Sequence, residues 1–159
     1  MENKGNKQIM HTTNYKKFSL MMMVSFIAMY VIMFLNIVDI SHFYVSATRI
    51  YMALLMAASM GVIMMLMMGK MYPDKKINTG IIAGSIVVFA LILAALRTQT
   101  PIGDVQYMKA MIPHHSSAIM TSENANIKDP EVRKLADGII EAQKKEIAEM
   151  KAILKRLEK

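Results

Sequence analysis

The chain has 159 residues, of which 54% are apolar, and it carries a net charge of +7. It contains no cysteine, which excludes disulfides, thiolate zinc sites and thiol redox chemistry. The positive charge does not indicate a nucleic-acid partner. Residues 1–97 hold nine Lys and Arg against three acids, whereas residues 98–159 hold ten against nine. The excess therefore lies beside the apolar segments, where it orients membrane helices and meets anionic lipid head groups.

A basic tail over 1–17 precedes three apolar runs, which we expect to form a transmembrane region over 18–97. A helix rises 1.5 Å per residue, so about 20 apolar residues cross a bilayer core of about 30 Å. The runs over 18–38 and 50–69 reach this length. The run over 79–96 is somewhat shorter but sufficient.

The Lys and Arg content of the short loops predicts the orientation of these spans. The tail has four Lys residues, and the 70–78 loop has Lys70, Lys75 and Lys76, whereas the 39–49 loop has only Arg49. We therefore expect the tail in the cytoplasm and the C-terminal domain outside it. This corresponds to a bacterial inner membrane with the C-terminal domain in the periplasm.

A linker over 98–103 leads into a predicted helical hairpin over 104–157. The first helix opens at the N-cap candidate Asp104 and contains Pro113, which removes a backbone donor and usually kinks a helix. Asp129 is the predicted cap of the second helix. The second helix is expected to pack on the first through residues at steps of four and three. These residues are Val132, Ala136, Ile139, Gln143, Glu146, Met150, Ile153 and Leu157.

Met108, Met111 and His115 lie at i, i+3 and i+7 of the first hairpin helix, so one face presents two thioethers and an imidazole. His114 flanks that face. Such donors without thiolate suit Cu(I) or Ag(I), whereas zinc, the weaker candidate, more often recruits Cys or several His and carboxylates. Alternatively, the Met side chains fill a core and the His pair lies on the surface. Further candidates in the hairpin are Met120, Gln143, Glu146 and Met150.

Two stretches over roughly 104–157 resemble the signature of the domain of unknown function 305. The first contains Asp104, Tyr107-Met108, Met111-Ile112-Pro113-His114-His115 and Ala118-Ile119. The second contains Asp129, Glu131-Val132, Leu135-Ala136, Ile139-Ile140, Ala142-Gln143, Glu146-Ile147 and Met150.

This resemblance implies a ferritin-like helical bundle that binds copper or silver outside the cytoplasm. It also implies that Glu146 orients an imidazole from behind the metal ligands. Larger members carry two hairpins, so a chain with one hairpin needs self-association to complete a four-helix bundle, and we expect a homo-oligomer. The implied ligands are Met108, Met111, His114, His115 and Met150.

A second group of methionines recurs every four residues along the second span, which gives a slanted stripe of thioethers across the membrane. The third span contains no Met, so a general bias toward Met does not explain the stripe. The stripe indicates either flexible apolar packing or a path for Cu(I) inside an oligomer. Its members are Met52, Met56, Met60, Met64 and Met68.

Asp39 and His42 in the first loop are candidates for a relay between the hairpin and this methionine stripe, although such a pair more often marks a wet helix end. Met10 and His11 in the tail form a weaker pair of the same kind.

The sequence thus predicts an all-α, membrane-anchored protein whose outer hairpin binds Cu(I), with Ag(I) as a mimic, for copper tolerance or copper handling. The expected partners are the bilayer, the metal ion, further copies of the chain, and a copper pump or periplasmic copper protein. No catalytic constellation is visible, so we expect no enzymatic activity. Two alternatives stay open: a Cu(I) transporter that uses the methionine stripe, and an oligomeric membrane scaffold without metal. Because an imidazole must be neutral to bind metal, affinity should weaken as the pH falls through about 6.5.

Overall fold

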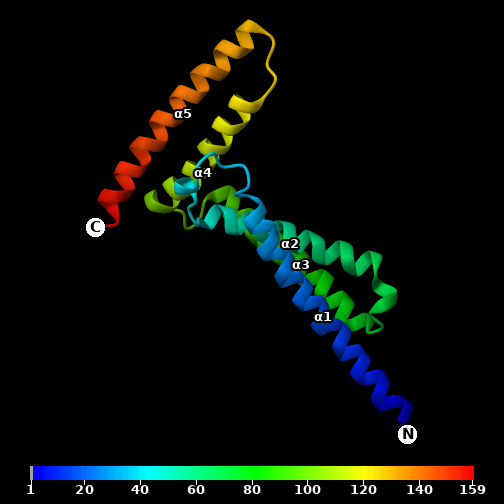
Figure 1. The fold of residues 1–159 in the computed structure, drawn as a ribbon. Helices are drawn as coiled ribbons and strands as arrows, with labels where there is room; N and C mark the ends of the chain where they lie inside the picture. Colours follow the sequence, from blue (N-terminus) through cyan, green and yellow to red (C-terminus); the bar gives the residue numbers. More distant parts are fainter. Residues whose placement is uncertain (1) are drawn as a thin grey trace. The chain divides into compact units, whose positions relative to one another are not determined.

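The computed structural model describes the backbone of residues 2–159 and the side chains of residues 14–69 and 71–159. All regular structure in this part of the chain is helical, so the predicted all-α class is confirmed. The side chains of Met10 and His11 lie outside the described residues. Five α-helices and two short 3₁₀ helices follow one another along the chain (Figure 1). They are α1 (Glu2–Ile32), η1 (Ile40–His42), α2 (Ala47–Met67), η2 (Gly69–Met71), α3 (Lys75–Thr98), α4 (Asp104–Asn124) and α5 (Pro130–Leu157).

The chain divides into two compact units, which we call the membrane unit and the hairpin unit. The membrane unit comprises the chain up to Val31 together with Ile50–Thr100. The hairpin unit comprises Ile32–Arg49 together with Pro101–Lys159.

Three helices are long and apolar enough to cross a membrane, as predicted: Asn14–Ile32, Ala47–Met67 and Lys75–Thr98. The share of buried residues in these segments is 33% for α2, 6% for α1 and zero for α3. The described part of the chain therefore leaves these outward-facing apolar side chains without cover, as is expected of helices that lie in the hydrocarbon of a bilayer.

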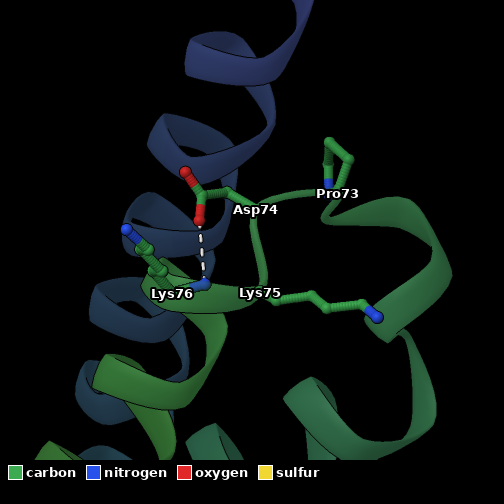
Figure 2. A pocket seen from close by; sticks show the side chains of 4 residues that line it. All are labelled: Pro73, Asp74, Lys75 and Lys76. Carbon is green, nitrogen blue, oxygen red and sulfur yellow. Dashed lines mark hydrogen bonds between the residues drawn. The ribbon is translucent and has the colours of Figure 1, made fainter.

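Local contacts fix the membrane helices against one another. Gly61 of α2 lies close to α3: a Cβ atom there would sit 2.9 Å from the Ser85 Oγ, so a larger residue would force the Ser85 side chain to shift. Asp74 caps α3 by accepting hydrogen bonds from the backbone N–H groups of Lys76 and Ile77. Figure 2 shows this cap beside Pro73 and the bond to Lys76.

The first apolar run leaves the helical conformation earlier than its hydropathy suggests. We expected a span over 18–38, but α1 ends at Ile32. The following residues belong to the hairpin unit and find polar partners on α4. The Val38 N–H donates to the Ser116 Oγ at 2.9 Å, and the Asn36 amide donates to the Ser117 Oγ at 2.7 Å. These long-range bonds give partners to one backbone N–H group and one side-chain amide of the irregular segment that follows α1.

In the hairpin unit, α4 and α5 run antiparallel and are joined by the 125–129 turn (Figure 1). Asp129 caps α5 as predicted, because its side chain accepts from the N–H groups of Glu131 and Val132. The predicted cap of α4 was wrong by one residue: Gly103 is the N-cap and Asp104 is the first helical residue. There the Asp104 carboxylate still interacts favourably with the positive end of the helix dipole. Helix α4 continues through Pro113.

The contact face of α5 lies further round the helix than the predicted face. Val132, Ile139, Ile153 and Leu157, all expected to pack on α4, are between 38% and 49% exposed. The apolar face of α5 is wider than one neighbouring helix can cover, and α4 covers only one side of it. The hairpin core consists of Met108, Ile112, Ile119, Ile147 and Leu154, with Tyr44, Val105, Ile140 and Met150 packed around it.

Candidate metal-binding site

The hairpin joins one histidine of α4 to one carboxylate of α5. The His115 Nε2 lies 2.7 Å from the Glu146 Oε2. His115 is only 8% exposed, whereas the Glu146 side chain is 51% exposed. An ionised carboxylate can only accept hydrogen bonds, so in the neutral form of the ring Nε2 carries the proton and Nδ1 keeps its lone pair. The pair therefore fixes both the orientation and the tautomer of the ring.

Two acceptor atoms, one in this pair and one beside it in the sequence, have no hydrogen-bond partner among the described residues. The His115 Nδ1 and the Gln143 Oε1 are both buried, and neither is paired with any residue that the structure describes. A buried acceptor without a donor costs about 1–3 kcal/mol. Gln143 lies one turn before Glu146 on α5. The hairpin thus has a nitrogen and an oxygen lone pair in its interior that a cation can satisfy.

The antiparallel register places two thioethers one helical turn away from the His115–Glu146 pair. Met111 lies four residues before His115, and Met150 lies four residues after Glu146. In antiparallel helices these two positions are at the same level, about 6 Å along the axis from the pair. Met111 is half-buried, and Met150 is half-buried against the hairpin core.

The remaining predicted hairpin ligands occupy different environments. Met108 is part of the buried core, and Met120 is half-buried beyond His115. His114 is exposed, and its ring centroid is 6.1 Å from that of His115. The two adjacent histidines, equivalent in sequence, therefore differ: one imidazole is held inside the hairpin and the other faces outward.

Within the described residues, no three His, Asp or Glu side chains gather closely enough to hold a metal ion. A metal bound at His115 would therefore have to draw on sulfur or amide oxygen for its other ligands.

The 32–49 segment contacts α4 directly beside His115, through a residue that the sequence did not single out. Ser116 is fully buried, and its Oγ lies 2.9 Å from both the Val38 N–H nitrogen and the His42 Nδ1. Ser116 lies four residues after Ile112 and three before Ile119, so it interrupts a buried apolar face. A buried polar residue needs a hydrogen-bond partner. A serine within an apolar helix face was therefore the feature of the sequence that could have revealed this contact.

The proposed relay residues have local partners in this segment. Asp39 caps η1, and the hydrogen bonds from Ser41 hold the pKa of its carboxyl below the ordinary value. Burial lowers the pKa of His42, the nearby Lys151 ammonium lowers it further, and Asp39 opposes the shift. Lys151 also donates to the Ser41 Oγ at 2.8 Å. His42 thus reaches the hairpin at Ser116.

The methionine stripe of α2 is not buried inside the membrane unit. Met56, Met60 and Met64 are half-buried, whereas Met52 and Met68 are exposed. Met68 lies just beyond the end of α2, as the N-cap of η2. The well-buried methionine of this helix is Met65, which packs with Phe18 and Tyr72. The stripe is therefore only partly covered within this unit, and Met64 packs against the cluster of Phe18, Met65 and Tyr72.

The chain thus combines three apolar helices with a helical hairpin in which a buried histidine contacts a half-exposed carboxylate. Residues 92–159 match the family described as Domain of unknown function (DUF305). This match covers α4 and α5 and agrees with the resemblance seen in the hairpin. An uncharacterized protein of Acanthamoeba polyphaga mimivirus is 46% identical over 72 residues, or 44% of this chain. The match spans 47% of that relative, about half its length. No solved structure matches the chain.

Proposed function

We propose that this protein is a membrane-anchored module that binds Cu(I), or Ag(I) in its place, in the α4–α5 hairpin. The observation that carries the proposal is the His115 ring, whose Nε2 is held by Glu146 while its buried Nδ1 has no partner among the described residues. A carboxylate behind an imidazole fixes the ring and raises its basicity toward a metal on the other nitrogen.

The donors near this ring favour a soft, monovalent ion. Met111 and Met150 offer thioethers one turn away, and Gln143 offers a buried carbonyl oxygen. Thioether and imidazole donors select Cu(I) and Ag(I) over harder cations. We therefore assign His115, Met111 and Met150 as ligands, with Glu146 as the orienting carboxylate. Met108 and His114 are secondary candidates, because one packs in the core and the other faces outward.

The placement of the hairpin outside the cytoplasm is part of the proposal. It is supported by the basic residues of the N-terminal tail and of the α2–α3 connection, in contrast to the single Arg49 of the α1–α2 connection. In this position the hairpin would sequester Cu(I) at the outer face of the inner membrane. It would serve copper tolerance, or pass the ion to a pump or a soluble copper protein.

The adjacent histidines provide a matched test. The full chain in detergent is titrated with Cu(I) under reducing conditions against a competing chelator, together with His115→Ala and His114→Ala. We expect His115→Ala to lose at least about 100-fold in affinity, since it removes a ligand and not only its support. His114→Ala should stay within a few-fold of wild type. Equal affinities for wild type and His115→Ala would refute the proposal.

A further inference from the structure

The side of α5 that α4 leaves uncovered has exposed apolar residues toward both ends of the helix and Glu146 near its middle. The apolar residues recur at steps of three and four from Val132 to Ala142 and again from Ile153 to Leu157, which is the spacing that fits another helix. Leu135 is 66% exposed, although it lies in an ordered helix whose other side is a packed core. We call this surface the α5 stripe; it consists of Val132, Leu135, Ile139, Ala142, Ile153 and Leu157.

We propose that a second copy of this chain covers the α5 stripe with its own α5, in antiparallel orientation about a two-fold axis. Glu131 and Arg156 lie at opposite ends of the helix, about seven turns apart, and flank the stripe on the same side. Antiparallel pairing brings Glu131 of each copy beside Arg156 of the other, whereas parallel pairing brings like charges together. A two-fold contact satisfies the same surface on both copies at once.

The charges of the stripe argue against a lipid surface as its cover. Glu146 lies within the stripe, and Glu131 and Glu149 lie along its edge. An anionic membrane surface would repel these carboxylates. A second α5 instead offers Arg156 to one of them and buries the apolar residues on both copies.

This arrangement covers the outer side of the His115–Glu146 pair. The α5 stripe runs from Val132 to Leu157, so its midpoint falls between Ala142 and Glu146. The exposed half of the Glu146 side chain therefore lies next to the two-fold axis, where the second copy shields it from water. The docking itself does not depend on metal binding.

The absence of cysteine allows a direct test with single introduced thiols. Ala142→Cys lies on the α5 stripe, and Ala148→Cys is an equally exposed alanine on the other side of the same helix. Both full-length variants are reconstituted in membranes and oxidised with diamide, which contains no copper. Because a disulfide requires Cα atoms within about 7 Å, we expect about tenfold more cross-linked dimer for Ala142→Cys. Equal or greater cross-linking of Ala148→Cys would overturn the proposal.

A second variant separates docking through the α5 stripe from chance encounters of membrane-anchored chains. Adding Leu135→Glu to Ala142→Cys places a charge in the stripe and should remove the cross-link, and the same change added to Ala148→Cys should alter nothing. A cross-link that persists with Leu135→Glu would contradict the docking. Protection of the introduced thiol by anionic lipid vesicles, without any cross-link, would assign the stripe to the membrane surface and would also contradict it.

Discussion

The membrane unit and the hairpin unit differ in what they bury. The three buried polar residues of the described chain, Ser46, His115 and Ser116, all belong to the hairpin unit. In the membrane unit the buried residues are apolar or glycine, and several methionines of α2 face outward. Lipid tolerates an outward-facing thioether without cost, whereas a buried imidazole requires partners or a purpose.

This difference explains why methionine has a different meaning in the two units. In α2 its regular spacing is compatible with simple packing, because nothing polar accompanies the sulfur atoms. In the hairpin, Met111 and Met150 lie one turn from a ring nitrogen that has a lone pair and no described partner. Substitutions in the hairpin unit should therefore change its stability and its metal binding, whereas substitutions of the methionines of α2 should change neither.

Core truncation should affect only the hairpin unit. Ile112 is fully buried in its core, so Ile112→Ala should destabilise the hairpin by about 2–5 kcal/mol through lost burial and a residual cavity. The measurement is hydrogen exchange of the α4 and α5 amides in the full chain. The control is Leu91→Ala, an exposed residue of α3 that should leave this exchange unchanged. Similar losses of protection in both variants would show that burial of Ile112 in the hairpin core is not what protects these amides.

Ser116→Ala should detach the 32–49 segment from α4. It leaves the Val38 N–H and His42 without their partner, which costs about 1–3 kcal/mol for buried groups. Ser117→Ala removes the more exposed bond to Asn36 and should cost no more than about 1.5 kcal/mol. Faster hydrogen exchange of the Val38 amide in Ser116→Ala alone would support this; unchanged exchange would show that Ser116 does not hold the segment.

Glu146→Gln should weaken Cu(I) binding without unfolding the hairpin. Loss of the carboxylate behind the ring releases the His115 orientation, and such losses reduce metal affinity by about 10–100-fold. The stability of the hairpin within one chain should change little, because the Glu146 side chain is half exposed there and its interaction with His115 is screened. Glu149→Gln, an exposed carboxylate of the same helix, is the matched control for chelator titration. A Glu146→Gln variant with wild-type affinity would remove the carboxylate from the site.

Acid should loosen the hairpin unit through His42. Its folded-state pKa is lowered, chiefly by burial and then by Lys151, so the unfolded chain takes up a proton first as the pH falls. Stability is therefore constant above the ordinary pKa of 6.5 and declines below it. Asp39, whose pKa is also lowered, has no effect until the pH falls below its ordinary value of 3.8. Urea denaturation between pH 7 and pH 5 measures the slope, and His42→Gln should flatten it; an unaltered slope would exclude His42 as its source.

Replacing Met56, Met60 and Met64 by Leu should have the smallest effect. The shapes are similar, so the unfolding free energy should change by less than about 1.5 kcal/mol, and the hairpin should bind Cu(I) as before. Cu(I) flux into proteoliposomes decides whether the methionine stripe conducts the ion. Unchanged flux would leave packing as its role, whereas loss of flux with intact binding would establish the transporter alternative.

Local features of the chain were predictable from the sequence, and those that depend on distant partners were not. The apolar runs, the Asp129 cap and the helical hairpin follow from hydropathy and capping chemistry within a few residues. The end of α1 at Ile32 was missed because residues 33–38 are mostly apolar in sequence, whereas the groups that this segment contacts, the hydroxyls of Ser116 and Ser117, lie about 80 residues further along the chain.

The candidate site shows the same division. The spacing of His115 and the methionines on one helix face was visible in the sequence. The sequence placed His115 on that face and His114 beside it, but it did not show that His115 is buried and His114 exposed, because burial depends on which side of α4 meets α5. For the same reason the periodicity of α5 did not show which half of its wide apolar face would be covered, and Val132 and Ile139 were placed in the wrong half.

X-ray absorption at the copper edge of the Cu(I)-loaded full chain is the sharpest test of Cu(I) binding by His115 and methionine sulfur. We expect a first shell that contains both sulfur and nitrogen scatterers. In His115→Ala the nitrogen contribution should be lost while the sulfur contribution remains. A shell of nitrogen and oxygen alone, unchanged by His115→Ala, would place the metal elsewhere and contradict the assignment of this hairpin as a thioether–imidazole site.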